Sequence, residues 1–478
     1  MLVDHKFTLV GPTVLAPGVY LPPFYYYSLI PFLWLFKFHL IGPDIYTALL
    51  GIASIGLFYL LAKDLFGIKP ALISSLIFSL NPYLIQVSRH AWNPNTIYFF
   101  TLLFSLSFER YLAGKKGSYL LLAPFSLAWA INLHLTVLVF IPLLVFLFAK
   151  EFYKKKNTKQ LFFPILVFIF FVSPIFIFEI RHNFPNTKGV LFFLRNQGAN
   201  VSLSWLAGQR ILNVLADWVK MPLMLFSGLN QAENLTINPS HILLFDKVSL
   251  LKNLMNLWGK TKLVFFFLIL AAVLFCQIKL WKTAKRATIK FILLFLVSGF
   301  AIRLFFPPGS FYFYHYTFLF PYPFLAVASF FGYILKKNKP WLKIASVLLV
   351  IVFCFLALFP EKIIAERRGE KYFLPVCALI DKDFTSGKIV IAANLIDQSR
   401  WDHNALEYRY FLEAFYRLPL GNWEEEDYRQ ADVLYLIDEG ELKEPLKLKG
   451  MEMEAFGPVK IEKTWEAETG QKIYKMTK

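Results

Sequence analysis

The stretch "SYLLLAPFSLAWAINLHLTVLVFIPLLVFLFAK", residues 118–150, decides the fold of this chain. A single membrane-spanning helix needs about 20 apolar residues, so this run is too long for one span and short for two. The tetrapeptide "INLH", residues 131–134, places polar groups at its middle, and both of its flanks are basic. We therefore predict a hairpin of two membrane helices that turns at residues 131–134.

The composition supports a polytopic membrane protein. The 478 residues are 57% hydrophobic and only 17% charged, which is more apolar surface than a soluble domain of this size could bury. The formal charge of +18 comes from short Lys/Arg clusters between apolar segments, so it does not indicate a nucleic-acid partner. The three cysteines form neither a disulfide framework nor a metal-binding pair.

Apolar runs predict about ten transmembrane helices. They lie near residues 45–62, 70–87, 94–109, 119–133, 135–149, 160–180, 262–280, 288–305, 312–335 and 341–359.

With the hairpin in place, alternate loops are basic, and such loops face the cytoplasm. These basic loops lie near residues 63–69, 110–116, 150–159, 279–290 and 336–339. The other loops, and the tail from Glu361, are then outside a plasma or inner membrane. Residues 1–43 must also lie outside, although neither a signal peptide nor a preceding span delivers them there. We therefore expect a truncated start that lacks its first transmembrane helix.

These assignments divide the chain into three parts. We predict an outer loop with a short interfacial helix over 1–43, a transmembrane domain over 44–360 with a long outer loop over 181–261, and an extracytoplasmic α/β domain over 361–478. In the last of these, "KIVIAAN" (388–394) and "DVLYLID" (432–438) are typical of strands, with a helix over about 402–417 between them. The outer loop contains a second amphipathic, interface-lying helix over 201–226.

Polar residues gather on the outer face. Arg89, Arg181 and Arg303 each end an outer helix, although the positive-inside bias acts against Arg there. Arg forks bind phosphate oxygens bidentately, and ionisable groups at such depths often mark a functional cavity. We predict a cavity for a lipid-linked phosphate, with donor-phosphate contacts from Arg89, Arg181, Arg303, His182 and His315. The predicted lining residues are His90, Asn93, Asn95, His134, Tyr25 and Tyr316. The alternative is that these residues are helix caps, aromatic anchors and headgroup contacts.

At this point the sequence resembles the GT-C superfamily of polyprenyl-phosphate-sugar-dependent glycosyltransferases, in particular the bacterial branch related to protein O-mannosyltransferases (family 39). The resemblance is carried, in order, by "GPT…YLPPFYYY" (11–27), "SRHAWNPN" (88–95), "NLHLT" (132–136), "FEIRHNFPNTKGVLFFLRN" (178–196) and "FYFYHYTFLFPYPF" (311–324). It implies an enzyme that moves a sugar from a polyprenyl-phosphate donor to a lipid, glycan or protein acceptor on the outer face, with inversion.

The resemblance also implies an acidic catalytic residue just after the first transmembrane helix. The chain has only Asp4 before Asp44, which makes Asp4 a weak candidate and leaves the catalytic residue unknown. Some members of the superfamily use a divalent metal, and nothing in this sequence fixes one. Two other functions stay open: a non-catalytic membrane assembly subunit, and a lipid or glycan transporter. A transporter would place polar groups near the span midpoints, where this chain has almost none.

Overall fold

A computed structural model describes most of the chain. The described residues are 7–13, 19–115, 117–155, 159–196, 313–337, 339–358, 369–395, 405–440 and 442–478, with Val214, Asp217, Met221, Leu225, Phe275, Ile278, Gly299 and Arg303. They form two compact units, one within residues 7–32 and 41–358 and the other within 33–40 and 369–478. Asp4 lies outside the described residues, as do the predicted spans 262–280 and 288–305 and the predicted outer loop from residue 197, apart from the single residues just named.

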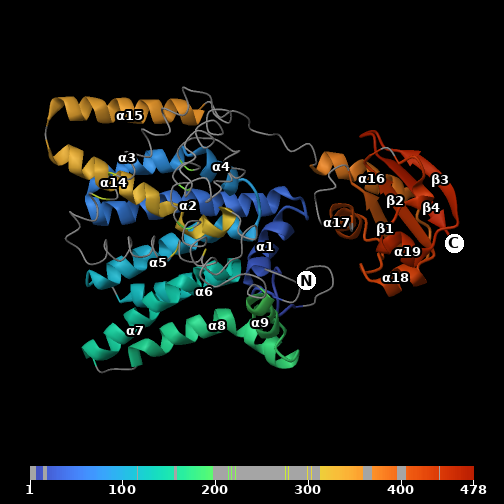
Figure 1. The fold of residues 1–478 in the computed structure, drawn as a ribbon, viewed down its shortest axis with the longest axis horizontal. Coiled ribbons are helices and arrows are strands. Elements are labelled where there is room, and N and C mark those ends of the chain that lie inside the picture. Colours follow the sequence, from blue (N-terminus) through green and yellow to red (C-terminus); the bar gives the residue numbers. More distant parts are fainter. Residues whose placement is uncertain are drawn as a thin grey trace. The chain divides into compact units, whose positions relative to one another are not determined.

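The first unit is helical (Figure 1). Its elements are α1 (Phe24–Leu35), α2 (Ile41–Phe66), α3 (Ile68–Ser79), α4 (Pro82–Ser88), the 3₁₀ helix η1 (Asn93–Thr96), α5 (Ile97–Leu112), α6 (Ser118–Leu133), η2 (Leu135–Phe140), α7 (Ile141–Lys155), α8 (Lys159–Arg181), α9 (Pro185–Asn196), η5 (Phe313–Leu319), α14 (Pro321–Lys336) and α15 (Pro340–Leu358). Among the described residues, four helical stretches are long and apolar enough to cross a membrane, or five with one bent pair.

The predicted hairpin is present. Helix α6 ends at Leu133, and His134 has the extended backbone angles φ −166° and ψ 142° before η2 and α7 begin. The His134 side chain accepts the Thr136 N–H at Nδ1, at 3.3 Å, which caps the new helix. The polar residues of "INLH" therefore end one helix and start the next.

The predicted span over 70–87 is two helices rather than one. Helices α3 and α4 meet at an angle of 63°. Asn81 caps α4 by accepting the Leu84 N–H at 3.0 Å, and Pro82 takes the first helical position. This pair of residues is a strong helix-start signal, so the sequence contained the reason for the break.

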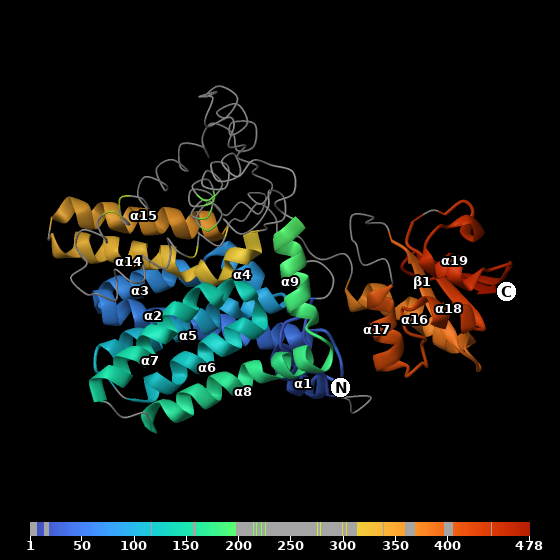
Figure 2. The ribbon, with the colours of Figure 1, turned by 60° about the horizontal axis from the view of Figure 1, so that its bottom comes forward.

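The helices pack in a continuous series. Helix α15 packs on α14, α14 on α3, α3 on α2, α2 on α5, α5 on α6, and α6 on α8 (Figure 2). Aromatic rings fill the interior; the rings of Phe58 and Phe78, for example, stack with their centres 4.8 Å apart. Helix α8 instead exposes large apolar side chains such as Phe163 and Phe170, as expected of a lipid-facing helix. The predicted class of polytopic helical membrane protein is confirmed.

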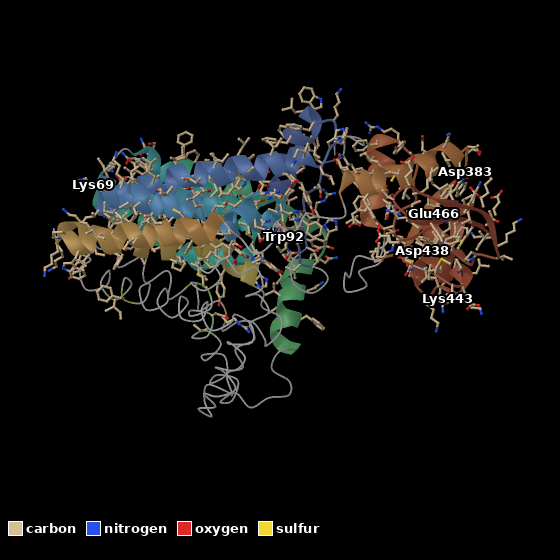
Figure 3. All side chains as sticks on the ribbon, turned by 90° about the horizontal axis from the view of Figure 1, so that it is seen from above. Lys69, Trp92, Asp383, Asp438, Lys443 and Glu466 are labelled. Carbon is tan, nitrogen blue, oxygen red and sulfur yellow. The ribbon has the colours of Figure 1, made fainter. Side chains whose placement is uncertain are left out.

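The two ends of this bundle differ in character. Lys69 and Trp92 lie at opposite ends (Figure 3). At the Lys69 end, Asp64 pairs with Arg110 at 2.7 Å and with Lys115 at 2.9 Å. Connections of the predicted basic set thus meet at one end, and the loops that are poor in Lys and Arg meet at the other, which we call the Trp92 end.

The second unit is a small α/β fold. Its elements are α16 (Glu370–Asp383), β1 (Ile389–Asn394), α17 (Leu406–Phe415), α18 (Glu425–Gln430), β2 (Val433–Asp438), η6 (Pro445–Lys447), α19 (Met451–Phe456), β3 (Lys460–Glu466) and β4 (Lys472–Thr477). The sheet order is β1-β2-β4-β3, with β1 and β2 parallel and the other pairs antiparallel. Both predicted strands and the helix between them are present. The prediction missed the hairpin of β3 and β4.

A charged network fixes the β3–β4 hairpin to α16. Asp383 (Figure 3) accepts hydrogen bonds from Lys463 at 2.8 Å and Tyr435 at 2.9 Å, and pairs with Lys475 at 3.0 Å. Burial opposes ionisation of Asp383, but these partners lower its pKa below the usual value. The carboxylate therefore stabilises the unit in its ionised form.

Candidate functional site at the Trp92 end

The Asn186 side chain holds the segment before α1 through two hydrogen bonds to its backbone, as a neighbouring strand would. Gly11 and Leu21 pair through their backbones, with the Gly11 N–H 2.7 Å from the Leu21 carbonyl oxygen. On the neighbouring residue, Asn186 donates to the Tyr20 carbonyl oxygen at 2.8 Å and accepts the Tyr20 N–H at 3.0 Å. A Cβ on Gly11 would collide with the Pro22 carbonyl oxygen. Glycine is therefore required at this close approach, and the start of α9 anchors the entry into α1.

The turn "SRHAWNPN" is built by its asparagines. Asn93 donates to the Leu133 carbonyl oxygen at 2.6 Å, so it caps the C-terminus of α6. Asn95 donates to the His90 carbonyl oxygen at 2.9 Å, and the Ala91 N–H donates to Asp44 at 2.8 Å. Both asparagines are buried. Asn93 is the first residue of η1, with Trp92 at the N-cap position, so its side chain caps the end of α6 rather than the start of its own helix.

Two histidines and two aromatic residues meet beside this turn. The rings of His134 and His315 lie 5.0 Å apart, and both residues are buried. The Tyr314 ring lies 4.3 Å from His315 and 4.6 Å from Trp92. Because Nδ1 of His134 accepts the Thr136 N–H, the neutral ring carries its proton on Nε2 and can donate from there.

Arg303 lies in the same cluster. Its Nε is 3.3 Å from Oδ2 of Asp217, and the same oxygen accepts the Tyr316 hydroxyl at 2.9 Å. The Arg303 side chain is only 9% exposed, against 21% for Asp217. His315 lies close enough to Arg303 for the two to interact electrostatically. We call His134, Asp217, Arg303, His315 and Tyr316 the arginine–histidine cluster.

Asp217 is the member that the sequence analysis missed. Val214, Asp217, Met221 and Leu225 are helical, and their spacing puts all four on one helix face. Met221 and Leu225 are fully buried in the core of the first unit. The sequence therefore did contain a signal for Asp217, because it places this carboxylate on the apolar face of an amphipathic helix. Such a residue is expected to meet a buried cation.

The other predicted cationic residues do not join this cluster. Arg89 and His90 are exposed at the end of α4, and Arg181 and His182 are exposed at the end of α8. His182 contacts the Phe178 carbonyl oxygen at 2.9 Å and stacks on the Phe178 ring. The predicted contacts of Arg89, Arg181 and His182 with a donor phosphate stay predictions, as does the predicted place of His90 in the pocket lining.

The neighbouring acidic residue has a structural role. Glu179 is buried and accepts the N–H groups of Asn186 and Thr187, at 2.7 and 3.0 Å. These are amides of the first turn of α9, where a carboxylate also interacts favourably with the helix dipole.

Tyr25, predicted to line the pocket, is buried in α1. Its hydroxyl has no hydrogen-bond partner among the described residues. It lies close enough to Tyr46 and Asp44 to interact with them electrostatically. Tyr25 therefore faces the polar side chains at the start of α2. Within the described part of the chain, no three metal-binding side chains gather into a cation site. The question of a divalent metal therefore stays open.

Residues 21–178 match the family model described as dolichyl-phosphate-mannose-protein mannosyltransferase. A comparison with curated proteins finds no relative of this chain.

Solved structures give looser similarities. ArnT from Cupriavidus metallidurans, solved bound to undecaprenyl phosphate, is 12% identical at a TM-score of 0.41, over 98% of this chain and 94% of ArnT. The archaeal oligosaccharyltransferase AglB from Archaeoglobus fulgidus, in complex with an inhibitory peptide and a dolichol-phosphate, is 12% identical at a TM-score of 0.44, over 88% of this chain and 62% of AglB. The family match runs from just before α1 to the end of α8 and covers less than half of the chain.

Proposed function

We propose that this chain transfers a sugar from a polyprenyl-phosphate donor to a lipid, glycan or protein acceptor, with inversion, at the Trp92 end of the bundle. In this proposal the Trp92 end faces outward from a plasma or inner membrane, and residues 361–478 form an extracytoplasmic domain. The observation that carries it is the burial of Arg303 beside His315 and His134, at the end away from the basic connections.

The chemistry asks for a cation beside the leaving phosphate. As the bond between sugar and phosphate breaks, negative charge grows on the phosphate oxygen, and a fixed guanidinium stabilises it more than it stabilises the intact donor. Arg303 supplies that charge from a buried position, where water weakens the interaction less. The Nε2–H of His134 is a second donor in the same cluster. The base for the acceptor hydroxyl is not assigned, and Asp4 remains the sequence candidate.

The test is sugar transfer from a labelled polyprenyl-phosphate sugar by the purified protein in lipid vesicles. Arg303→Gln should lower turnover by about 10²–10³, the usual effect of losing one preorganised charge-stabilising contact. Arg303→Lys should recover part of it, because Lys keeps the charge but not the planar fork. Wild-type turnover in a folded Arg303→Gln protein would overturn the proposal.

The exposed arginines provide the matched comparison. Arg89→Gln and Arg181→Gln remove the same charge at the same end of the bundle, but from exposed side chains. If both retain near-normal turnover, these residues are helix-end contacts and the donor phosphate is bound by the arginine–histidine cluster alone. A loss as large as that of Arg303→Gln would confirm the broader phosphate site predicted from the sequence.

A further inference from the structure

Asp217 places a negative charge where the proposed function needs a positive one. Its Oδ2 lies 3.3 Å from Arg303 Nε and also holds the Tyr316 hydroxyl, so the carboxylate is fixed from two sides. Arg303 is thus paired before any phosphate arrives. A phosphate bound to the guanidinium would lie within about 7 Å of this carboxylate, a separation at which unit charges still interact at an effective dielectric constant of about 20.

Donor and product of the proposed reaction differ in charge. The donor is a phosphodiester with one negative charge, joined to a polyprenyl chain on one side and a sugar on the other. The acceptor hydroxyl forms a bond to the sugar, the bond between sugar and phosphate oxygen breaks with its electron pair staying on that oxygen, and the hydroxyl proton is released. The remaining polyprenyl phosphate is a monoester, which carries close to two negative charges above pH 7 because its second pKa is about 6.

We propose that Asp217 is a specificity residue that weakens binding of the doubly charged product at the Arg303 site more than it weakens binding of the singly charged donor. The inference rests on the proposed function. Arg303 attracts both lipids, and the carboxylate repels the monoester about twice as strongly as the diester. Without Asp217 the spent polyprenyl phosphate binds more tightly and leaves more slowly. The carboxylate therefore promotes product release, while the guanidinium still stabilises the transition state.

The experiment measures the affinities of two lipids that differ by one charge, undecaprenyl phosphate and its methyl phosphodiester, for the full chain in detergent at pH 8. Native mass spectrometry reports both affinities without requiring turnover. Asp217→Asn keeps the shape and an oxygen that can accept the Tyr316 hydroxyl, and removes only the charge. It should shift the affinity ratio toward the monoester on the order of tenfold. Asp217→Glu, which keeps the charge, should retain the wild-type ratio.

Tyr316→Phe is the structural control. It removes the other partner of Oδ2 and leaves the charge in place, so it should change both affinities together and leave the ratio unchanged.

Three results would overturn the inference: an unchanged ratio in Asp217→Asn, an equal ratio shift in Tyr316→Phe, or loss of both lipids in Asp217→Asn. The last would mean that Asp217 only holds Arg303 in place. A wild-type protein that binds neither lipid would instead overturn the proposed function itself.

Discussion

Asn132 should be one of the most sensitive positions in the first unit. Its side chain is fully buried. Its Oδ1 accepts the Phe24 N–H at 3.2 Å, and its Nδ2 donates to the carbonyl oxygens of Ala128 at 2.9 Å and Phe171 at 3.0 Å. One amide therefore ties α1 and α8 to α6, two residues before His134.

We expect Asn132→Leu to destabilise the protein by about 2–3 kcal/mol. Each net hydrogen bond contributes about 0.5–1.5 kcal/mol, and a buried donor left unpaired costs about 1–3 kcal/mol. The Phe24 N–H is such a donor, because the first turn of α1 has no carbonyl of its own to offer it. Hydrogen bonds between helices in membranes average nearer 0.6 kcal/mol, so we take the expected loss of stability from the lower end of the range that these contributions allow.

The assay is equilibrium unfolding in mixed detergent micelles, followed by circular dichroism. Ser173→Ala is the matched control, since the hydrogen bond of the Ser173 hydroxyl within the described part of the chain stays in its own helix, to the Phe170 carbonyl oxygen at 2.9 Å, and the residue is only half-buried. It should cost less than about 0.5 kcal/mol. If Asn132→Leu is no more destabilising than this control, the bond to α1 does not hold the helices together and the reasoning fails.

Three further predictions concern other parts of the chain. Gly11→Ala should lower the melting temperature by several degrees, and Gly117→Ala, whose Cβ meets open space, should not; equal effects would refute the close-packing argument. The pKa of Asp383 is lower in the folded protein than in the unfolded chain, where it is about 3.9. The ionised carboxylate therefore stabilises the sheet at any pH above about 3.9, and this stabilisation is lost as the pH falls through the folded-state pKa. Asp383→Asn should therefore speed hydrogen exchange in β3 and β4 at pH 7, and a difference that persists below pH 3 would contradict this. In a cysteine-free background, impermeant thiol reagents should label His182→Cys from outside and Lys337→Cys only after permeabilisation; the reverse pattern would invert the proposed topology.

Local signals predicted most of the described helices and the difference in charge between the two ends of the bundle. The polar break at His134 and the alternation of basic loops act through hydrogen bonding and membrane charge, which a sequence displays directly. The bend at Asn81–Pro82 was equally local, and hydropathy concealed it because the residues on both sides are apolar. The β3–β4 hairpin escaped prediction because β3 is mostly exposed and has no alternating apolar pattern.

The composition of the site depended on tertiary contacts. His134 and His315 are far apart in sequence, and only packing brings their rings together. In the sequence, Arg89, Arg181 and Arg303 are equally good candidates for binding a phosphate. The structure distinguishes them, because Arg303 is buried and the other two are exposed. Asp217 could have been predicted as a buried carboxylate from its helix face, but its pairing with Arg303 could not.

The central claim is that the arginine–histidine cluster binds the donor phosphate, and photocrosslinking tests it most directly. A polyprenyl-phosphate sugar carrying a diazirine in its first isoprene unit would be irradiated with the full chain in lipid vesicles, and the labelled peptides would be identified by mass spectrometry. We predict labels in η5 and around His134, reduced by Arg303→Gln and by excess unlabelled donor. Labels confined to the Lys69 end, or to the exposed face around Arg181, would contradict the account.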